Sequence, residues 1–175
     1  MSRAMYSAGT TAPFVAVAGA AMFFVITGSP SKKVVVCHIG ISGLTQTAVG
    51  YVSVVAERWS SAPTVGTAVP LLKVPYNPDD PVASASLVQV YTAAPTEGVL
   101  VGTIEARRWL DQATVAAAAG YPPDAQFEFG KTAAHHRLRY TGIVLRDQSE
   151  AVSLAFAAAP ASAVTMALCV DWYEE

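Results

Sequence analysis

The histidines and cysteines are the side chains of this chain best suited to metal binding or nucleophilic catalysis. His135 and His136 are adjacent, so in a strand their rings would point to opposite faces and would not easily share one metal. Cys37 and Cys169 are far apart in the sequence and lie in no motif with zinc-ligand spacing. We therefore interpret the histidine pair as part of a solvated loop that enters a strand, and both cysteines as packed, free thiols.

The acidic residues form no recognisable catalytic or calcium-binding pattern. Asp79 and Asp80 are the best calcium candidates, but prolines surround them and the alternating spacing of a calcium loop is missing, which indicates a turn. Glu57, Glu105 and Glu128 fall in or beside expected strands, and nothing in the sequence pairs them as a hydrolase requires. Signatures of a serine nucleophile or a phosphate-binding loop are also missing. The sequence therefore predicts a non-enzymatic protein without catalytic residues, metal ions or cofactors.

The composition indicates one domain that associates with other protein surfaces. The chain has 175 residues, a length typical of a single domain. Charged residues make up 14% of it, against roughly 25% in an ordinary soluble domain, which favours burial against further copies of the chain. The net charge of −2 argues against nucleic acid as a partner. The longest apolar run, residues 14–26, is shorter than the about 20 residues that span a membrane, and we interpret it as strand rather than as a secretory signal.

Gly and Pro turns separate many short segments rich in β-branched residues, which favours strands. We expect strands at 22–26 and 34–41 joined by a turn, and a hairpin of 87–93 and 99–107 around the turn at 94–98. Further strands are expected at 48–59, 126–130, 138–146, 151–156 and 164–173. A helix is plausible only within 109–119, where an Ala-rich loop fits almost as well.

The last of these strands has the clearest alternation. Its large apolar residues recur at every second position: Val164, Met166, Leu168, Val170 and Trp172. Together the segments predict a single-domain, all-β, antiparallel jelly-roll-like β-sandwich over residues 14–175, preceded by an N-terminal arm over 1–13.

Aromatic and basic residues supply the candidate contact sites. The three tryptophans each lie beside a charged or polar residue at a strand end or turn, where they would fill core corners or anchor an interface. The basic residues after the histidine pair could contact an acidic patch of a neighbouring subunit. The possible interface residues are Trp59, Trp109, Arg137, Arg139 and Trp172.

Several segments in order resemble small virion structural proteins of tailed bacteriophages and prophages. They include FVITGSPSKKVVV at 24–36, NPDDPVA at 77–83, YTAAPTEG at 91–98 and VDWYEE at 170–175. Shorter matching segments lie at 39–42, 54–58, 66–68 and 102–104. The resemblance implies a decoration, cement or head-fibre protein, a jelly-roll homotrimer on the capsid surface whose partners are its own copies and the major capsid protein. It implies no active-site residues.

Two other functions compete with this reading. A tail- or fibre-associated carbohydrate-binding or adhesion module would use Trp59, Trp109 or Tyr76 to stack on sugar rings. A cupin-like metalloenzyme on the same plan is disfavoured, because His38, His135 and His136 do not give the required ligand spacing.

Overall fold

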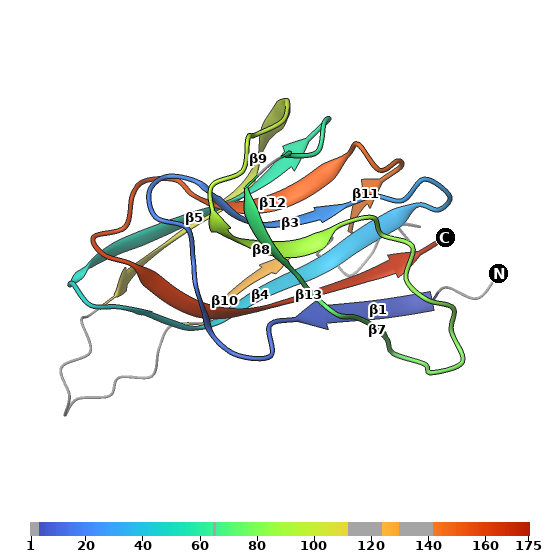
Figure 1. Cartoon of the computed structure of the whole chain (residues 1–175), viewed down its shortest axis with the longest axis horizontal. Coiled ribbons are helices and arrows are strands. Elements are labelled where there is room, and N and C mark those ends of the chain that lie inside the picture. Colours follow the sequence, from blue (N-terminus) through green and yellow to red (C-terminus); the bar gives the residue numbers. More distant parts are fainter. Residues whose placement is uncertain (1–3, 65, 112–123, 130–141) are drawn as a thin grey trace, which may run out of the picture.

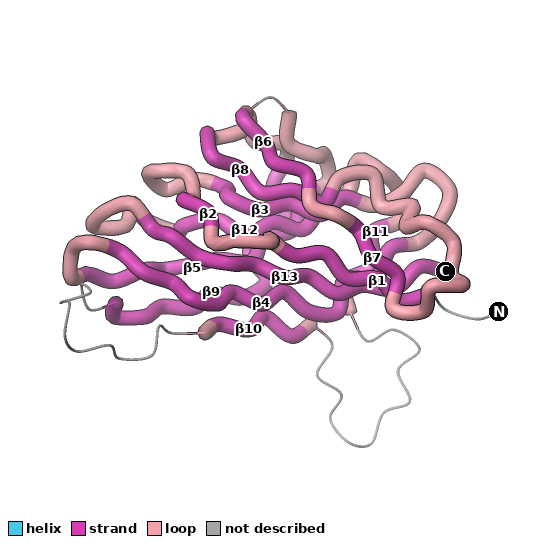
Figure 2. The backbone as a smooth tube through the Cα atoms, turned by 60° about the horizontal axis from the view of Figure 1, so that its bottom comes forward, coloured by secondary structure: helices cyan, strands magenta, loops and turns pink. Residues whose placement is uncertain are grey.

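The computed structural model describes residues 4–64, 66–111, 124–129 and 142–175. Regular structure in these residues consists of strands only, with no helix among them (Figure 2). The strands form two antiparallel sheets that pack against each other (Figure 1). The predicted all-β class is therefore confirmed.

The larger sheet, sheet A, has the strand order β10-β4-β13-β1-β7, with β11 also pairing to β4 and β2 to β13. Its strands are β10 (Ala125–Glu128), β4 (Val34–Gln46), β13 (Val164–Glu174), β1 (Ala4–Gly9), β7 (Lys73–Pro75), β11 (Ile143–Leu145) and β2 (Phe14–Val15). Strand β13 lies at the centre, between β4 and β1.

The second sheet, sheet B, has the strand order β6-β8-β3-β12-β5-β9. Its strands are β6 (Thr67–Pro70), β8 (Val88–Ala93), β3 (Met22–Thr27), β12 (Ala151–Phe156), β5 (Gly50–Trp59) and β9 (Leu100–Asp111). The outermost strands, β6 and β9, each pair with one neighbour within the described part of the chain.

The strands expected at 22–26 and 34–41 are present but do not pair with each other, and the predicted hairpin of 87–93 and 99–107 is wrong. Strands β3 and β4 follow each other in sequence but lie in different sheets, and β8 and β9 lie near opposite edges of sheet B. The turns at 28–33 and 94–99 therefore connect distant strands and close no hairpin. Strand β3 is buried on both faces: one face packs in the core against sheet A, and the other is covered by a second apolar cluster that includes Trp59 and Tyr91.

The core lies between the two sheets and confirms the predicted alternation of the last strand. All five apolar residues at alternate positions of β13 are buried and belong to the main core. At its centre Trp172 stacks on Tyr6 of β1, with the ring centroids 5.7 Å apart. Large apolar side chains at this depth contribute about 1.5–3 kcal/mol each by leaving water.

Bulges change which residues of β4 face the core. Val36 lies opposite Trp172 and His38 opposite Asp171, so Cys37 is an extra residue between two paired positions. Val34 and Val36 therefore face the core before the bulge, and Ile39 and Ile41 after it. Strict alternation would place Cys37 on the same face as Ile39 and Ile41, but the one extra residue exchanges the two faces.

Two further expectations are corrected. Residues 1–13 are not a separate arm, since 4–9 form β1, which pairs with β13 on one side and β7 on the other. The first three residues of the expected helix at 109–119 belong to β9 instead, and the rest of that segment lies outside the described residues.

Candidate interaction surfaces and polar clusters

The five predicted interface residues do not form one surface. Trp172 is 0% exposed and Trp59 is 3% exposed, so both are core residues that a partner cannot reach. Trp109 is partly buried and packs against the main core from the edge strand β9. Arg137 and Arg139 lie outside the described residues. For Trp59 and Trp172 the core interpretation is confirmed and the interface interpretation is wrong.

Trp59 belongs to a second apolar cluster on the outer face of sheet B. Its indole Nε1 donates a buried 2.8 Å hydrogen bond to the Ser153 hydroxyl of the neighbouring strand β12. The other members of this cluster are Met22, Val25, Tyr91, Ala151 and Ala155. Ala151, Ser153 and Ala155 of β12 are small and leave room for the indole. The outer face of sheet B is therefore covered by large side chains of sheet B itself.

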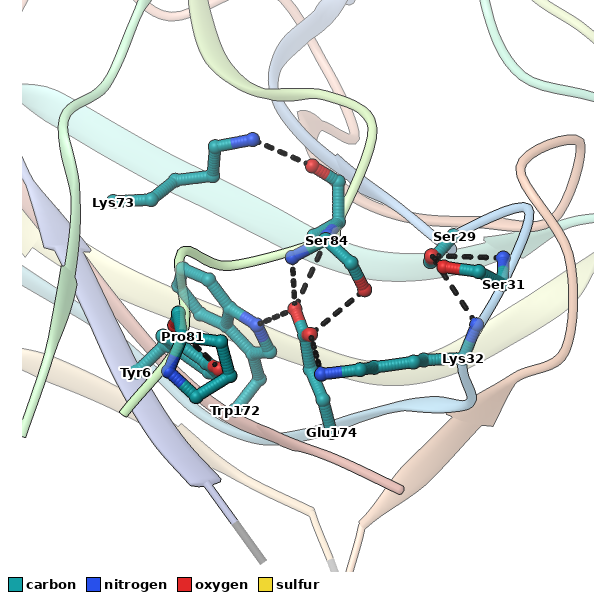
Figure 3. A network of polar contacts seen from close by, with 10 residues as sticks. Tyr6, Ser29, Ser31, Lys32, Lys73, Pro81, Ser84, Trp172 and Glu174 are labelled. Atoms are coloured by element: carbon teal, nitrogen blue, oxygen red, sulfur yellow. Dashed lines mark hydrogen bonds and ion pairs between the residues drawn. The ribbon is translucent and has the colours of Figure 1, made fainter. Parts of the chain in front are cut away.

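A carboxylate is buried at the end of β13, where Figure 3 shows Glu174 surrounded by donors. Its side chain is 0% exposed. One oxygen accepts bonds from the backbone N–H groups of Ser84 (2.7 Å) and Ala85 (3.1 Å) and from the Trp172 indole (3.2 Å). The other accepts from the Ser84 hydroxyl at 2.7 Å and lies 3.6 Å from the Lys32 ammonium. These partners offset the cost of burying the charge.

The Glu174 cluster fixes the connection between β7 and β8. Two further contacts act on the same stretch, because Tyr6 donates to the Pro81 carbonyl at 2.9 Å and Lys73 to the Ala85 carbonyl at 2.7 Å (Figure 3). The connection therefore lies firmly against the end of the sandwich. Reasoning from the sequence missed this site, because glutamate usually faces solvent and nothing near Glu174 in the sequence indicates a buried partner.

The outer face of sheet A has a second polar cluster, formed by His38, Asp171 and Tyr76. The Asp171 carboxylate lies 3.3 Å from His38 Nδ1 and accepts a 3.0 Å hydrogen bond from the Tyr76 hydroxyl. His38 and Asp171 are directly opposite on β4 and β13, and the Tyr76 side chain reaches Asp171 from the end of β7. Tyr76 is 62% exposed, which makes its ring the most accessible aromatic surface in this cluster.

Cys169 lies beside this cluster. A Cβ atom added at Gly40 would come within 2.8 Å of the Cys169 sulfur and 3.1 Å of His38 Cε1, so a glycine at this position leaves space for both side chains. Although the residue is exposed, partial removal of water from the thiol raises its pKa, and the charge of Asp171 raises it further. The thiol therefore stays protonated at neutral pH and is a poor nucleophile.

Cys37 and Cys169 form no disulfide, as predicted, but only Cys37 is partly buried, so Cys169 is not a packed thiol. Among the described residues, no group of three or more His, Cys, Asp or Glu side chains could hold a metal ion. Asp79 and Asp80 form the predicted turn, in which the Asn77 side chain accepts from the Asp79 N–H and its carbonyl from the Asp80 N–H. His135 and His136 lie outside the described residues.

The remaining acidic candidates are distributed over the two sheets. Glu105 forms an ion pair with Arg107 at 2.6 Å on β9, and Arg107 also lies over the Phe127 ring of β10, 5.6 Å from its centroid. Glu128 pairs in register with His38. Partial burial raises the pKa of Glu57, and the nearby Glu97 charge adds to the effect. None of these contacts places two carboxylates across a cleft as a hydrolase requires.

Most of the large exposed apolar side chains lie on or beside two opposite edges of sheet B, and the others are Val15, Val49 and Tyr51. The first edge follows β6 and β7 and continues into neighbouring residues, and we call it the β6–β7 edge: Met5, Val69, Leu72, Val74, Tyr76, Val82 and Leu87. The second lies at the start of β9, and we call it the β9 edge: Val99, Leu100, Val101 and Ile104. Leu72 is 76% exposed, an unusual position for leucine on a strand connection.

Comparison with known proteins gives no further guide to the site. Neither a family model, nor a curated protein, nor a solved structure matches this chain. In the part of the chain that the structure describes, no helix is long and apolar enough to cross a membrane.

Proposed function

We propose that this chain is a non-enzymatic virion structural protein, a capsid decoration or cement protein that forms a homotrimer and binds the major capsid protein on the head surface. The observation that carries the proposal is the pair of exposed apolar edges. Removing apolar surface from water contributes about 25 cal/mol per Å², so such edges favour protein contacts over solvent.

The order of the strands supports a jelly roll as the framework for this role. Strands β1-β13-β4-β10 and β3-β12-β5-β9 are neighbours in the two sheets, and β3, β4, β12 and β13 alternate between them along the chain. This order is the one expected when a long hairpin wraps around a barrel. In this reading, β6, β7 and β8 extend the two sheets at one side and provide the β6–β7 edge.

A carbohydrate-binding or adhesion module is the second candidate, and one observation favours it. Tyr76 is exposed and its hydroxyl donates to Asp171, a contact that orients the ring and leaves its surface open for stacking on a sugar. The other two proposed sugar contacts are weaker, because Trp59 is in the core and Trp109 is partly buried.

One experiment with two arms separates the candidates. The first arm measures the mass of the full chain in solution and its cosedimentation with heads of the phage or prophage that encodes it. We expect a mass three times the 18.3 kDa of one chain and saturable binding to heads. A monomer that leaves heads unbound would refute the virion role. The second arm is a glycan array, on which binding that depends on Tyr76 would support the adhesion module instead.

A further inference from the structure

Polar side chains form a row across the outer face of sheet A, where strands β10, β4, β13 and β1 lie side by side (Figure 1). The register places Glu128 opposite His38, and His38 opposite Asp171. Ser7 of β1 lies on the other side of Asp171. We call these four residues the polar row. Neighbouring strands are about 4.8 Å apart, so adjacent members of the polar row can hydrogen-bond to one small ligand.

The next row of the same face has little side-chain bulk. Gly40 and Gly9 lie opposite Cys169 on its two sides. A Cβ atom at Gly40 would lie 3.5 Å from His38 Nε2 and 2.8 Å from the Cys169 sulfur, so glycine keeps space beside this ring nitrogen. Because His38 Nδ1 lies against the Asp171 carboxylate, Nε2 is the ring nitrogen that can bind a ligand in that space.

Tyr76 adds an aromatic surface beside the polar row. Its ring is mostly exposed, and its hydroxyl donates a 3.0 Å hydrogen bond to Asp171. An aromatic ring offers a flat apolar face to the C–H groups of a sugar at low cost in side-chain entropy. A neutral imidazole accepts a hydrogen bond at its unprotonated nitrogen, and a carboxylate accepts more than two. The cluster therefore combines a stacking surface with acceptors for neighbouring hydroxyl groups.

The charge of this surface limits the class of sugar. Asp171 and Glu128 both carry carboxylates in the polar row. Among the described residues of the polar row and of the glycine row beside it, none is a lysine or an arginine. A carboxylated, sulfated or phosphorylated sugar would therefore meet like charge without a cation to offset it.

We infer that the outer face of sheet A binds a neutral sugar, which stacks on Tyr76 while its hydroxyl groups donate to Asp171 and to His38 Nε2. This inference rests on the carbohydrate-binding candidate proposed above, and it gives that candidate a site and a ligand class. It does not require the virion role.

A glycan array with neutral and acidic oligosaccharides tests the site in the full chain, followed by calorimetric titration with the neutral sugar that binds most strongly. The wild type should bind neutral sugars and leave acidic ones unbound. Tyr76→Ala removes the stacking surface and should weaken binding about tenfold. Asp171→Asn removes the charged acceptor and should also weaken it about tenfold. Tyr51→Ala is the matched control, because Tyr51 is 55% exposed but lies under Arg108 on sheet B, and it should bind as the wild type does.

A further pair of variants tests the space beside His38. Gly40→Ala in a Cys169→Ala background places a methyl group there and removes the sulfur that this group would meet. The double variant should lose most of the sugar binding, whereas Cys169→Ala alone should keep it. Circular dichroism checks that every variant keeps the wild-type sheet content.

The outcomes separate this inference from both candidate functions. Sugar binding that Tyr76→Ala and Asp171→Asn leave unchanged refutes this site and keeps the adhesion module. A preference for acidic sugars refutes the inference as well. An array without any binding removes the site and the carbohydrate-binding candidate together, and leaves the virion role to the cosedimentation with heads. Sugar binding through this surface by a protein that leaves heads unbound keeps the inference and removes the virion role.

Discussion

Asp171 and Glu174 lie three residues apart on the same strand, yet their surroundings differ completely. The Glu174 carboxylate is 0% exposed and accepts four hydrogen bonds in addition to its ion pair with Lys32. The Asp171 carboxylate is 24% exposed and contacts two side chains, His38 and Tyr76, of which Tyr76 is mostly in solvent. One strand thus provides a structural carboxylate and a surface carboxylate.

The two carboxylates differ in the kind of group that donates hydrogen bonds to them. Two of the Glu174 donors are backbone N–H groups of the connection before β8, which cannot turn away without moving the chain. Both Asp171 partners are side chains that can rotate into water. Removing Glu174 would leave buried donors unpaired, whereas removing Asp171 would release groups that water can satisfy. The end of the sandwich around Glu174 is therefore fixed, whereas the outer face of sheet A around Asp171 remains accessible to partners.

The largest effect is expected for Glu174→Ala. Loss of a buried carboxylate that pairs with a cation and several donors should lower the free energy of unfolding by about 3–5 kcal/mol. Urea unfolding followed by tryptophan fluorescence measures the change, with the exposed Asp79→Ala variant as control, for which we expect less than about 0.5 kcal/mol. Glu174→Gln should fall between them, because it keeps one acceptor. A loss below about 1 kcal/mol for Glu174→Ala would show that the cluster is not structural.

The sequence was sufficient for the fold class because the relevant signals are local. Period-two alternation in 164–173 predicted both the strand and its buried face, and the three prolines of 75–81 predicted the surface loop. Strand β7 is short, lies at an edge of sheet A and ends at Pro75, which is the position that a proline favours in a sheet. Each of these features depends only on residues within the segment itself.

Pairing and site geometry were not predictable because they depend on distant residues. The turn at 94–98 has hairpin length, but the strands that it joins do not pair with each other: β8 pairs with β3 and β6, and β9 pairs with β5. The bulge at Cys37 is visible only in the register with Asp171 and Trp172. The donors of Glu174 come mainly from Ser84 and Ala85, about half the chain away.

A smaller effect is expected for Glu57→Gln, which probes a third carboxylate, on the outer face of sheet B. Partial burial and the charge of Glu97 raise the pKa of Glu57. The folded state then holds its proton to higher pH than the unfolded state, so the wild type loses stability as the pH rises through the folded pKa. Glu57→Gln should match the wild type in acid and exceed it at pH 7, by less than about 1 kcal/mol because solvent screens a partly exposed charge.

Unfolding curves recorded between pH 4 and pH 8 test this sign. Glu97→Gln is the matched control, since it removes the neighbouring charge but leaves Glu57 ionisable, and it should recover part of the gain. If Glu57→Gln were less stable than the wild type at pH 7, the hydrogen bond between Glu57 and Ser153 would contribute more than the cost of burying the charge. Glu57 would then be a stabilising carboxylate, as Glu174 is.

The smallest effect is expected for Asp171→Asn. Asparagine keeps an oxygen for the Tyr76 hydroxyl, and exposed ion pairs contribute little, so the free energy of unfolding should change by less than about 0.5 kcal/mol. Urea unfolding at pH 7 measures it beside Glu174→Gln, the same acid-to-amide change in the buried cluster. Equal losses would contradict the division of β13 into a structural and a surface carboxylate. A stable Asp171→Asn protein therefore separates surface function from folding, so any binding it loses on heads or glycans belongs to the outer face of sheet A.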